Sequence, residues 1–89
     1  MRLDKYLKVS RLIKRRPLAK EVTEKGRISV NGTQAKPGTN VKVGDELHIR
    51  LGQRMVTVRV DAIKENARKE EASDMYTILK EERVETEEF

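Results

Sequence analysis

Apolar residues near the start of the chain recur at helical spacing. Leu3 and Leu7 lie four residues apart, with Tyr6 beside them, and they form a narrow apolar stripe. This stripe predicts a short helix from Leu3 to about Val9. Asp4 falls in the first turn, where a carboxylate is favourable beside the helix dipole, and it is equally placed to anchor a neighbouring arginine.

A second helix is indicated between Pro17 and Gly26. Proline suits the first helical position, and glycine suits the position just past the end. The buried stripe of this helix is expected from Leu18, Ala19 and Val22. Arg16 then takes the cap position, where Ser, Thr, Asp or Asn is usual. A poor cap leaves backbone N–H groups available, so this helix end is a natural site for phosphate.

Alternation of apolar and polar residues from position 27 predicts a small sheet. Residues 27–30 lead into Asn31-Gly32, a strong hairpin signal because both central residues of a type I′ turn need positive φ. The alternation over 46–51 and 55–60 indicates two half-buried strands joined by a short turn. The expected fold class is therefore α+β, with two N-terminal helices packed on a small, mostly antiparallel sheet.

Beyond position 60 the pattern weakens. A short polar helix is expected over 67–75, and the apolar group Tyr76, Ile78 and Leu79 is expected to fold back on the sheet. The chain is thus predicted to divide into a domain at residues 1–60, a C-terminal extension at 61–80 that packs on it, and an acidic, disordered tail at 81–89.

Charge is distributed unevenly along the chain. Residues 1–60 carry 15 Lys or Arg against 5 Asp or Glu, whereas residues 61–89 carry 5 against 10. Eight of the basic residues lie within the first twenty positions. A basic body with an acidic tail indicates nucleic-acid binding, with the tail limiting promiscuity or meeting a protein.

The composition argues against several other classes of function. The chain has no cysteine, which excludes disulfides and thiolate metal sites, and its one histidine, His48, is expected on a strand surface. No apolar run approaches the roughly 20 residues of a membrane span, and the N-terminus is unlike a signal peptide. We therefore expect a cytoplasmic protein that is not an enzyme and uses no cofactor or metal.

Four short motifs resemble the S4-type RNA-binding domain. They are RLDKYL at 2–7, Arg16 followed three residues later by Ala19, GRISVNG at 26–32 and VGD at 43–45. The resemblance covers residues 1 to about 60 and implies that the two helices and the hairpin form an RNA-binding face. Arg15 stands where that family usually has serine, which adds charge suited to phosphate.

The whole chain, including residues 71–82, resembles the RqcP family, the small S4-domain factors of bacterial ribosome-associated quality control, which are related to the fifteen-kilodalton heat-shock protein. This resemblance implies binding to large ribosomal subunits that carry an obstructed peptidyl-tRNA, through rRNA and the P-site tRNA. It also implies cooperation with the RqcH protein in non-templated alanine tailing, with the factor holding tRNA while the ribosome makes the bond. A monomer that binds neither DNA nor membrane is expected.

Two other interpretations stay open from the residues alone. One is a generic rRNA-binding factor of ribosome assembly or heat shock, and the other is a protein-interaction domain with a basic face. Because aromatic residues are 3% of the chain, stacking on single-stranded bases is disfavoured relative to recognition of folded RNA through shape and backbone.

Arginine is expected to contribute more than lysine, because its planar fork can grip two phosphate oxygens. Arg2, Arg11, Arg15 and Arg16 therefore rank above the lysines. The residues expected to contact RNA are Arg2, Asp4, Lys5, Lys8, Arg11, Lys14, Arg15, Arg16, Lys20 and Asn31.

Overall fold

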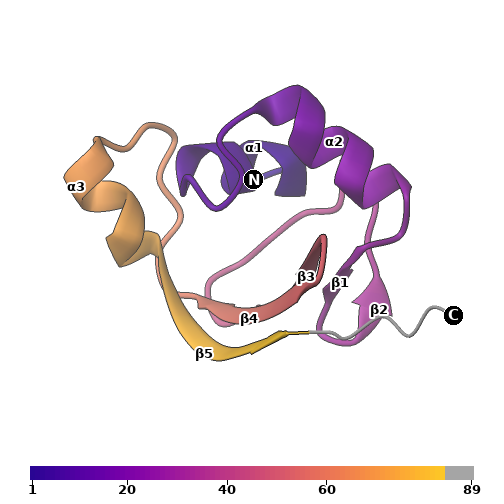
Figure 1. Ribbon diagram of the computed structural model, residues 1–89. Coiled ribbons are helices and arrows are strands. Elements are labelled where there is room, and N and C mark those ends of the chain that lie inside the picture. The colour runs from indigo at the N-terminus through magenta and orange to yellow at the C-terminus, as the bar shows by residue number, and fades with distance from the viewer. Residues whose placement is uncertain (84–89) are drawn as a thin grey trace, which may run out of the picture.

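Two helices lie over one face of a five-stranded antiparallel sheet in the computed structural model, which describes residues 1–83 (Figure 1). The strands are ordered β2-β1-β3-β4-β5. The α+β class predicted from the sequence is confirmed. The elements are α1 Leu3–Val9, α2 Arg16–Glu24, β1 Ile28–Val30, β2 Thr33–Gln34, β3 Glu46–Leu51, β4 Arg54–Val60, α3 Lys69–Ala72, the 3-10 helix η1 Ser73–Met75 and β5 Tyr76–Arg83.

Helix α1 has the predicted bounds, but α2 begins one residue earlier than expected. Arg16 is already helical, so the cap is Arg15, with extended φ and ψ of −117° and 125°. The expectation that Arg16 caps the helix was therefore wrong, because Pro17 tolerates the second helical position as well as the first. The expected lack of a side-chain cap holds at Arg15.

Leu18 does not join the buried stripe of α2. Its exposed fraction is 46%, whereas Ala19, Val22 and Thr23 are buried. Each step along a helix turns about 100°, so a stripe at 19, 22 and 23 places position 18 to one side. Thr23 belongs to the stripe because its hydroxyl donates to the Ala19 carbonyl at 2.7 Å, which satisfies the buried polar group.

The hairpin at Asn31-Gly32 forms as predicted. Asn31 and Gly32 have φ of 52° and 84°, as a type I′ turn requires, and Val30 pairs with Thr33 across it. β1 also pairs with β3, and β3 pairs with β4 along its whole length. The hairpin of β1 and β2 therefore forms one edge of the sheet, and the side chains on the inner face of the sheet contact the helices.

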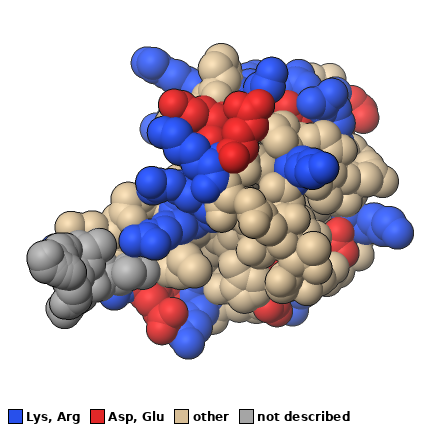
Figure 2. Space-filling model, turned by 90° about the vertical axis from the view of Figure 1, so that its right-hand side faces the viewer, with Lys and Arg blue, Asp and Glu red and all other residues tan. Residues whose placement is uncertain are grey.

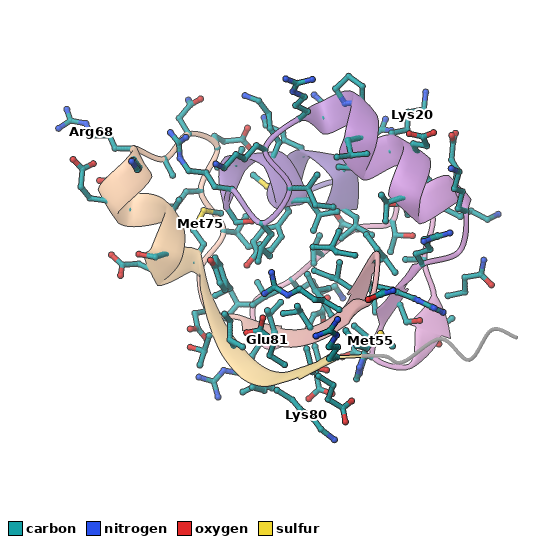
Figure 3. All side chains as sticks on the ribbon, in the orientation of Figure 1. Lys20, Met55, Arg68, Met75, Lys80 and Glu81 are labelled. Atoms are coloured by element: carbon teal, nitrogen blue, oxygen red, sulfur yellow. The ribbon has the colours of Figure 1, made fainter. Side chains whose placement is uncertain are left out.

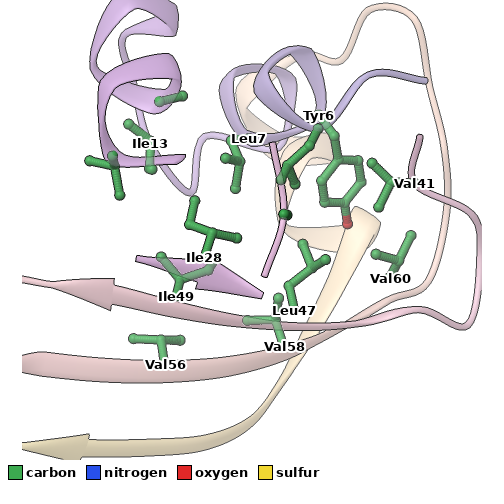
Figure 4. Close-up of a cluster of buried hydrophobic side chains, with 14 of the residues drawn as sticks. Tyr6, Leu7, Ile13, Ile28, Val41, Leu47, Ile49, Val56, Val58 and Val60 are labelled. Carbon is green, nitrogen blue, oxygen red and sulfur yellow. The ribbon is translucent and has the colours of Figure 1, made fainter. Parts of the chain in front are cut away.

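The core lies between the helices and the inner face of the sheet (Figure 4). Tyr6 and Leu7 from α1 pack on the inward residues of β1, β3 and β4, and all are nearly inaccessible. The Tyr6 hydroxyl donates to the Met75 carbonyl at 2.6 Å and so fastens η1 to α1. Burial, together with the nearby charge of Asp61, raises the pKa of the Tyr6 phenol, which therefore stays a neutral donor.

The C-terminal extension completes the sheet. α3 and η1 bury Ala72 and Met75, and β5 then pairs with β4 from Val60↔Tyr76 to Arg54↔Arg83. Residues 81–83, expected in a disordered tail, instead end this strand, because β4 offers them backbone partners and Arg54 offers Glu81 an ion pair. The rest of that tail, 84–89, lies outside the described residues. Within 1–83, no helix is long and apolar enough to cross a membrane.

Candidate nucleic-acid interface

Asp4 is a buried carboxylate that holds two arginines. Its side chain is 4% exposed, and its Oδ1 accepts a hydrogen bond from Arg2 Nε at 3.2 Å. Its Oδ2 lies 3.4 Å from Arg2 Nη2 and 3.6 Å from Arg16 Nε. The sequence left two roles open for Asp4, and these contacts show that it anchors neighbouring arginines. The group of Arg2, Asp4 and Arg16 is called the arginine clamp below.

The start of α1 is fixed by the loop at 37–39, which positions the clamp. The Leu3 amide donates to the Thr39 carbonyl at 2.8 Å, and the Asp4 amide donates to the Pro37 carbonyl at 3.1 Å. The Asp4 side chain contacts the two arginines and also accepts a hydrogen bond from the Lys5 backbone amide, which donates to Oδ1 at 2.8 Å. The local fold thus sets the direction in which the two arginines leave the surface.

Both arginines of the clamp keep donors free for a ligand. The Arg2 and Arg16 side chains are 57% and 46% exposed. A guanidinium carries five N–H groups, and Asp4 occupies only one edge of each. Partly exposed ion pairs contribute about 0–1 kcal/mol to stability, so the clamp serves orientation more than folding.

The N-terminus of α2 adds charge beside the clamp. Arg15 and Arg16 are exposed there, and no side chain caps the helix. The first backbone N–H groups and the positive end of the helix dipole are therefore available to an anion. Lys20 lies one turn further along and projects from the side of α2 that faces away from the sheet (Figure 3).

The loop between the helices gathers three more of the predicted cations. Lys8, Arg11 and Lys14 line a shallow hollow together with Asn66 of the extension. Arg11 has φ of 63°, a left-handed conformation that costs a residue other than glycine about 1–2 kcal/mol. This residue directly follows the C-cap of α1, and its amide donates to the Lys8 carbonyl at 3.0 Å, so the conformation serves to end the helix. Contact of Arg11 with RNA stays a prediction.

Two predicted contact residues are engaged within the protein. The Lys5 ammonium contacts the Glu65 carboxylate, and this hydrogen bond, with the charge, lowers the pKa of Glu65. The side-chain Nδ2 of Asn31 donates to Asp45 Oδ1 at 3.1 Å, and its Oδ1 accepts a hydrogen bond from the backbone N–H of Glu46 at 2.9 Å. Asn31 thus ties two turns together. Contact of either residue with RNA stays a prediction.

A further pair of arginines was missed from the sequence. Arg27 directly precedes β1, and Arg50 lies in β3 opposite it. Alternation with the buried Ile28 and Ile49 was the available signal for placing both on the outer face of the sheet. Figure 2 shows basic side chains gathered in a band on this side of the molecule. Over residues 1–83, no group of three His, Cys, Asp or Glu is placed to hold a metal ion.

Comparison with known proteins gives matches over most of the chain. The S4 domain family matches residues 1–47. A protein of Listeria innocua named RQC P-site tRNA stabilizing factor is 71% identical over 84 residues, which cover 94% of this chain and 91% of that protein. The protein of that name in Bacillus subtilis is 66% identical over 84 residues, which cover 94% of this chain and 98% of that protein. The structure of heat shock protein 15 from Vibrio cholerae, described as trimeric, superposes with a TM-score of 0.82 at 34% identity, covering 88% of this chain and 80% of that one.

Proposed function

This chain belongs to the S4 domain family, and on that premise we propose that it is an RNA-binding factor that stabilises P-site tRNA on the large ribosomal subunit. The observation that carries the proposal is the arginine clamp. A buried carboxylate that aims two half-exposed guanidinium groups outward suits a folded RNA backbone, which offers paired phosphate oxygens.

The relatives named RQC P-site tRNA stabilizing factor support a finer proposal, a role in ribosome-associated quality control. The factor binds subunits that carry an obstructed peptidyl-tRNA, contacts rRNA and the P-site tRNA, and supports RqcH in alanine tailing of the stalled chain. It holds tRNA in place and is not the catalyst, since its cations suit phosphate contact and the ribosome supplies the reactive centre. It acts in the cytoplasm as a monomer.

A second candidate function is a general rRNA-binding role in assembly or heat shock. The superposition on heat shock protein 15 favours it, because the two chains share the fold over most of their lengths. The two roles differ in the state of the subunit that each requires. A quality-control factor needs peptidyl-tRNA on the subunit, whereas an assembly factor needs immature rRNA.

Sedimentation of the tagged protein from a lysate with stalled translation separates the two functions. We expect co-migration with large subunits that carry peptidyl-tRNA, and loss of this co-migration when the peptidyl-tRNA is released by puromycin. We expect Arg16→Ala, which removes one arginine of the clamp, to weaken the co-migration. Lys69→Ala, on an exposed residue of α3, is its matched control. Co-migration with assembly precursors alone would favour the second function, and absence from all ribosomal fractions at low salt would contradict both.

A further inference from the structure

Arg27 and Arg50 are neighbours across two strands. The Arg50 amide donates to the Arg27 carbonyl at 2.9 Å, which extends the β1–β3 ladder one pair beyond Ile28↔Ile49. Alternation then sends both arginine side chains to the outer face of the sheet, since Ile28 and Ile49 point into the core. The two arginine side chains therefore lie next to each other, close to the end of α2, where Glu21 and Lys25 line a hollow with them.

Placing like charges directly across a sheet is unfavourable. Within residues 1–83, no carboxylate forms an ion pair with either arginine. The Arg50 side chain reaches only the Gly52 carbonyl, at 3.5 Å. The folded chain thus keeps an electrostatic cost here that an anion would relieve.

The surroundings of the pair complete a surface for an anion. Both arginines line one hollow, together with Lys25, Ser29 and Met55. No Asp or Glu lines this hollow among the residues that the structure describes. Figure 2 shows basic side chains on this side of the molecule, with acidic side chains beside them. The hollow therefore offers two arginines and a hydroxyl. Lys25 is paired with Glu21 at 3.5 Å, and Glu21 lines a neighbouring hollow with the same two arginines.

This surface is separate from the arginine clamp. The clamp lies at the beginnings of α1 and α2, whereas Arg27 follows the end of α2 and Arg50 lies opposite Arg27 in β3. The nine residues of α2, about 13 Å of helix at 1.5 Å per residue, therefore separate the two surfaces.

We propose that Arg27 and Arg50 form a second RNA-binding surface that grips backbone phosphates on the outer face of the sheet. The proposal deepens the proposed function and rests on it, since a factor that stabilises tRNA on a subunit must contact two RNA molecules. One surface grips one RNA and the arginine clamp grips the other. Arginine is better suited than lysine to this task, because its fork matches two phosphate oxygens.

The test compares three double variants on three probes. The variants are R27Q/R50Q, R2Q/R16Q for the clamp, and R68Q/K69Q as a control of equal charge loss on α3. The probes are vacant large ribosomal subunits, their protein-free rRNA, and deacylated tRNA. Binding is measured over a series of KCl concentrations, and melting temperature is measured for each variant.

We expect R27Q/R50Q to bind rRNA or tRNA about 10- to 100-fold more weakly, and its salt slope to fall by about 1.4–1.8 for two lost phosphate contacts. Its melting temperature should be unchanged or higher, because a like-charge pair has been removed. The control should keep wild-type affinity within a few fold.

Three results would overturn the proposal. The first is wild-type affinity of R27Q/R50Q for both RNA probes. The second is a fall in its melting temperature, which would assign the pair to the fold. The third is weaker binding to intact subunits alone, which would indicate an acidic ribosomal protein as the partner. Failure of the proposed function looks different. In that case the wild-type chain itself would bind neither subunits nor tRNA.

Discussion

The Nε of Arg16 lies 3.6 Å from the buried Oδ2 of Asp4, and this contact joins the first turns of two helices. Asp4 also accepts hydrogen bonds from Arg2. The two arginines therefore leave the surface in directions fixed by one carboxylate. An arginine whose orientation is already set loses less side-chain entropy when it grips a phosphate.

Replacing Arg16 should damage binding more than folding. In Arg16→Ala, a half-exposed ion pair is lost, which costs less than about 1 kcal/mol of stability and so lowers the melting temperature by a few degrees. Loss of a charged hydrogen bond to RNA, about 1.5–3 kcal/mol, should weaken subunit binding about 10- to 100-fold. Thermal melting and subunit sedimentation measure the two effects. A melting temperature lower by more than 10 °C would assign Arg16 to the fold.

Replacing Asp4 should damage both folding and binding. Asp4→Asn keeps the shape but leaves Arg2 and Arg16 without their charged partner, and a buried amide must then find new hydrogen bonds. We expect a loss of about 1–3 kcal/mol in the free energy of unfolding and weaker RNA binding.

A double-mutant cycle of Asp4→Asn with Arg16→Ala separates orientation from simple charge. Positioning by Asp4 predicts that the two losses in binding free energy are not additive. Full additivity would mean that Asp4 acts on binding independently of Arg16.

Lys5 was predicted to contact RNA, but in the structure its side chain is paired with Glu65, and this pairing allows a test. Its ammonium contacts Glu65, so Glu65→Gln should release it and raise RNA affinity several-fold, as measured by filter binding. Glu24→Gln is the matched control, because it makes the same change in net charge at an exposed position of α2. An equal gain in both variants would attribute the effect to bulk charge and count against a contact at Lys5.

The helices and the hairpin were predictable because their signals are local. The apolar stripe of α1, Pro17 in the first turn of α2 and the positive φ of Asn31-Gly32 each follow from neighbouring residues. Leu18 was misplaced because helical spacing alone cannot show which side of a narrow stripe meets the sheet. β5 was missed as a strand because each of its residues after Tyr76 is exposed, so its sequence lacks the apolar–polar alternation that marks a half-buried strand.

The clustering of candidate site residues was less predictable than the fold. The sequence suggested that Asp4 anchors an arginine, and the structure identifies Arg2 and Arg16 as the partners. The contact between Lys5 and Glu65 spans sixty positions and has no local signature. Pairing of Arg27 with Arg50 depends on strand register, which only the folded sheet sets.

Asp61 predicts a dependence of stability on pH. Thr77 donates a hydrogen bond to its carboxylate and Arg59 Nε donates another at 2.9 Å, and both lower the pKa of Asp61 from its ordinary 3.8. A carboxyl whose pKa is lowered by folding stabilises the fold above its unfolded pKa, and this contribution is lost as pH falls through the folded value. Asp61→Asn should therefore be less stable than wild type at pH 6.

The difference in urea midpoint between Asp61→Asn and wild type should narrow once the pH falls below about 3.8, because wild-type Asp61 is then being protonated. Glu70→Gln serves as the control, on an exposed residue of α3. A difference that stays constant from pH 6 to pH 2 would show that the charge of Asp61 is not what stabilises the junction of β4 and β5.

Two truncations test where the folded part of the chain ends. Removing residues 84–89 deletes three glutamates and should leave the melting temperature unchanged and RNA binding equal or slightly stronger. Removing 81–89 also deletes the last three pairings of β5 with β4, including Val56↔Glu81, and uncovers the buried Val56. At about 0.2–1 kcal/mol a pair, the loss of three pairs should lower the free energy of unfolding by about 0.6–3 kcal/mol. Urea unfolding of both proteins measures the difference, and equal stability would show that β5 effectively ends before Glu81.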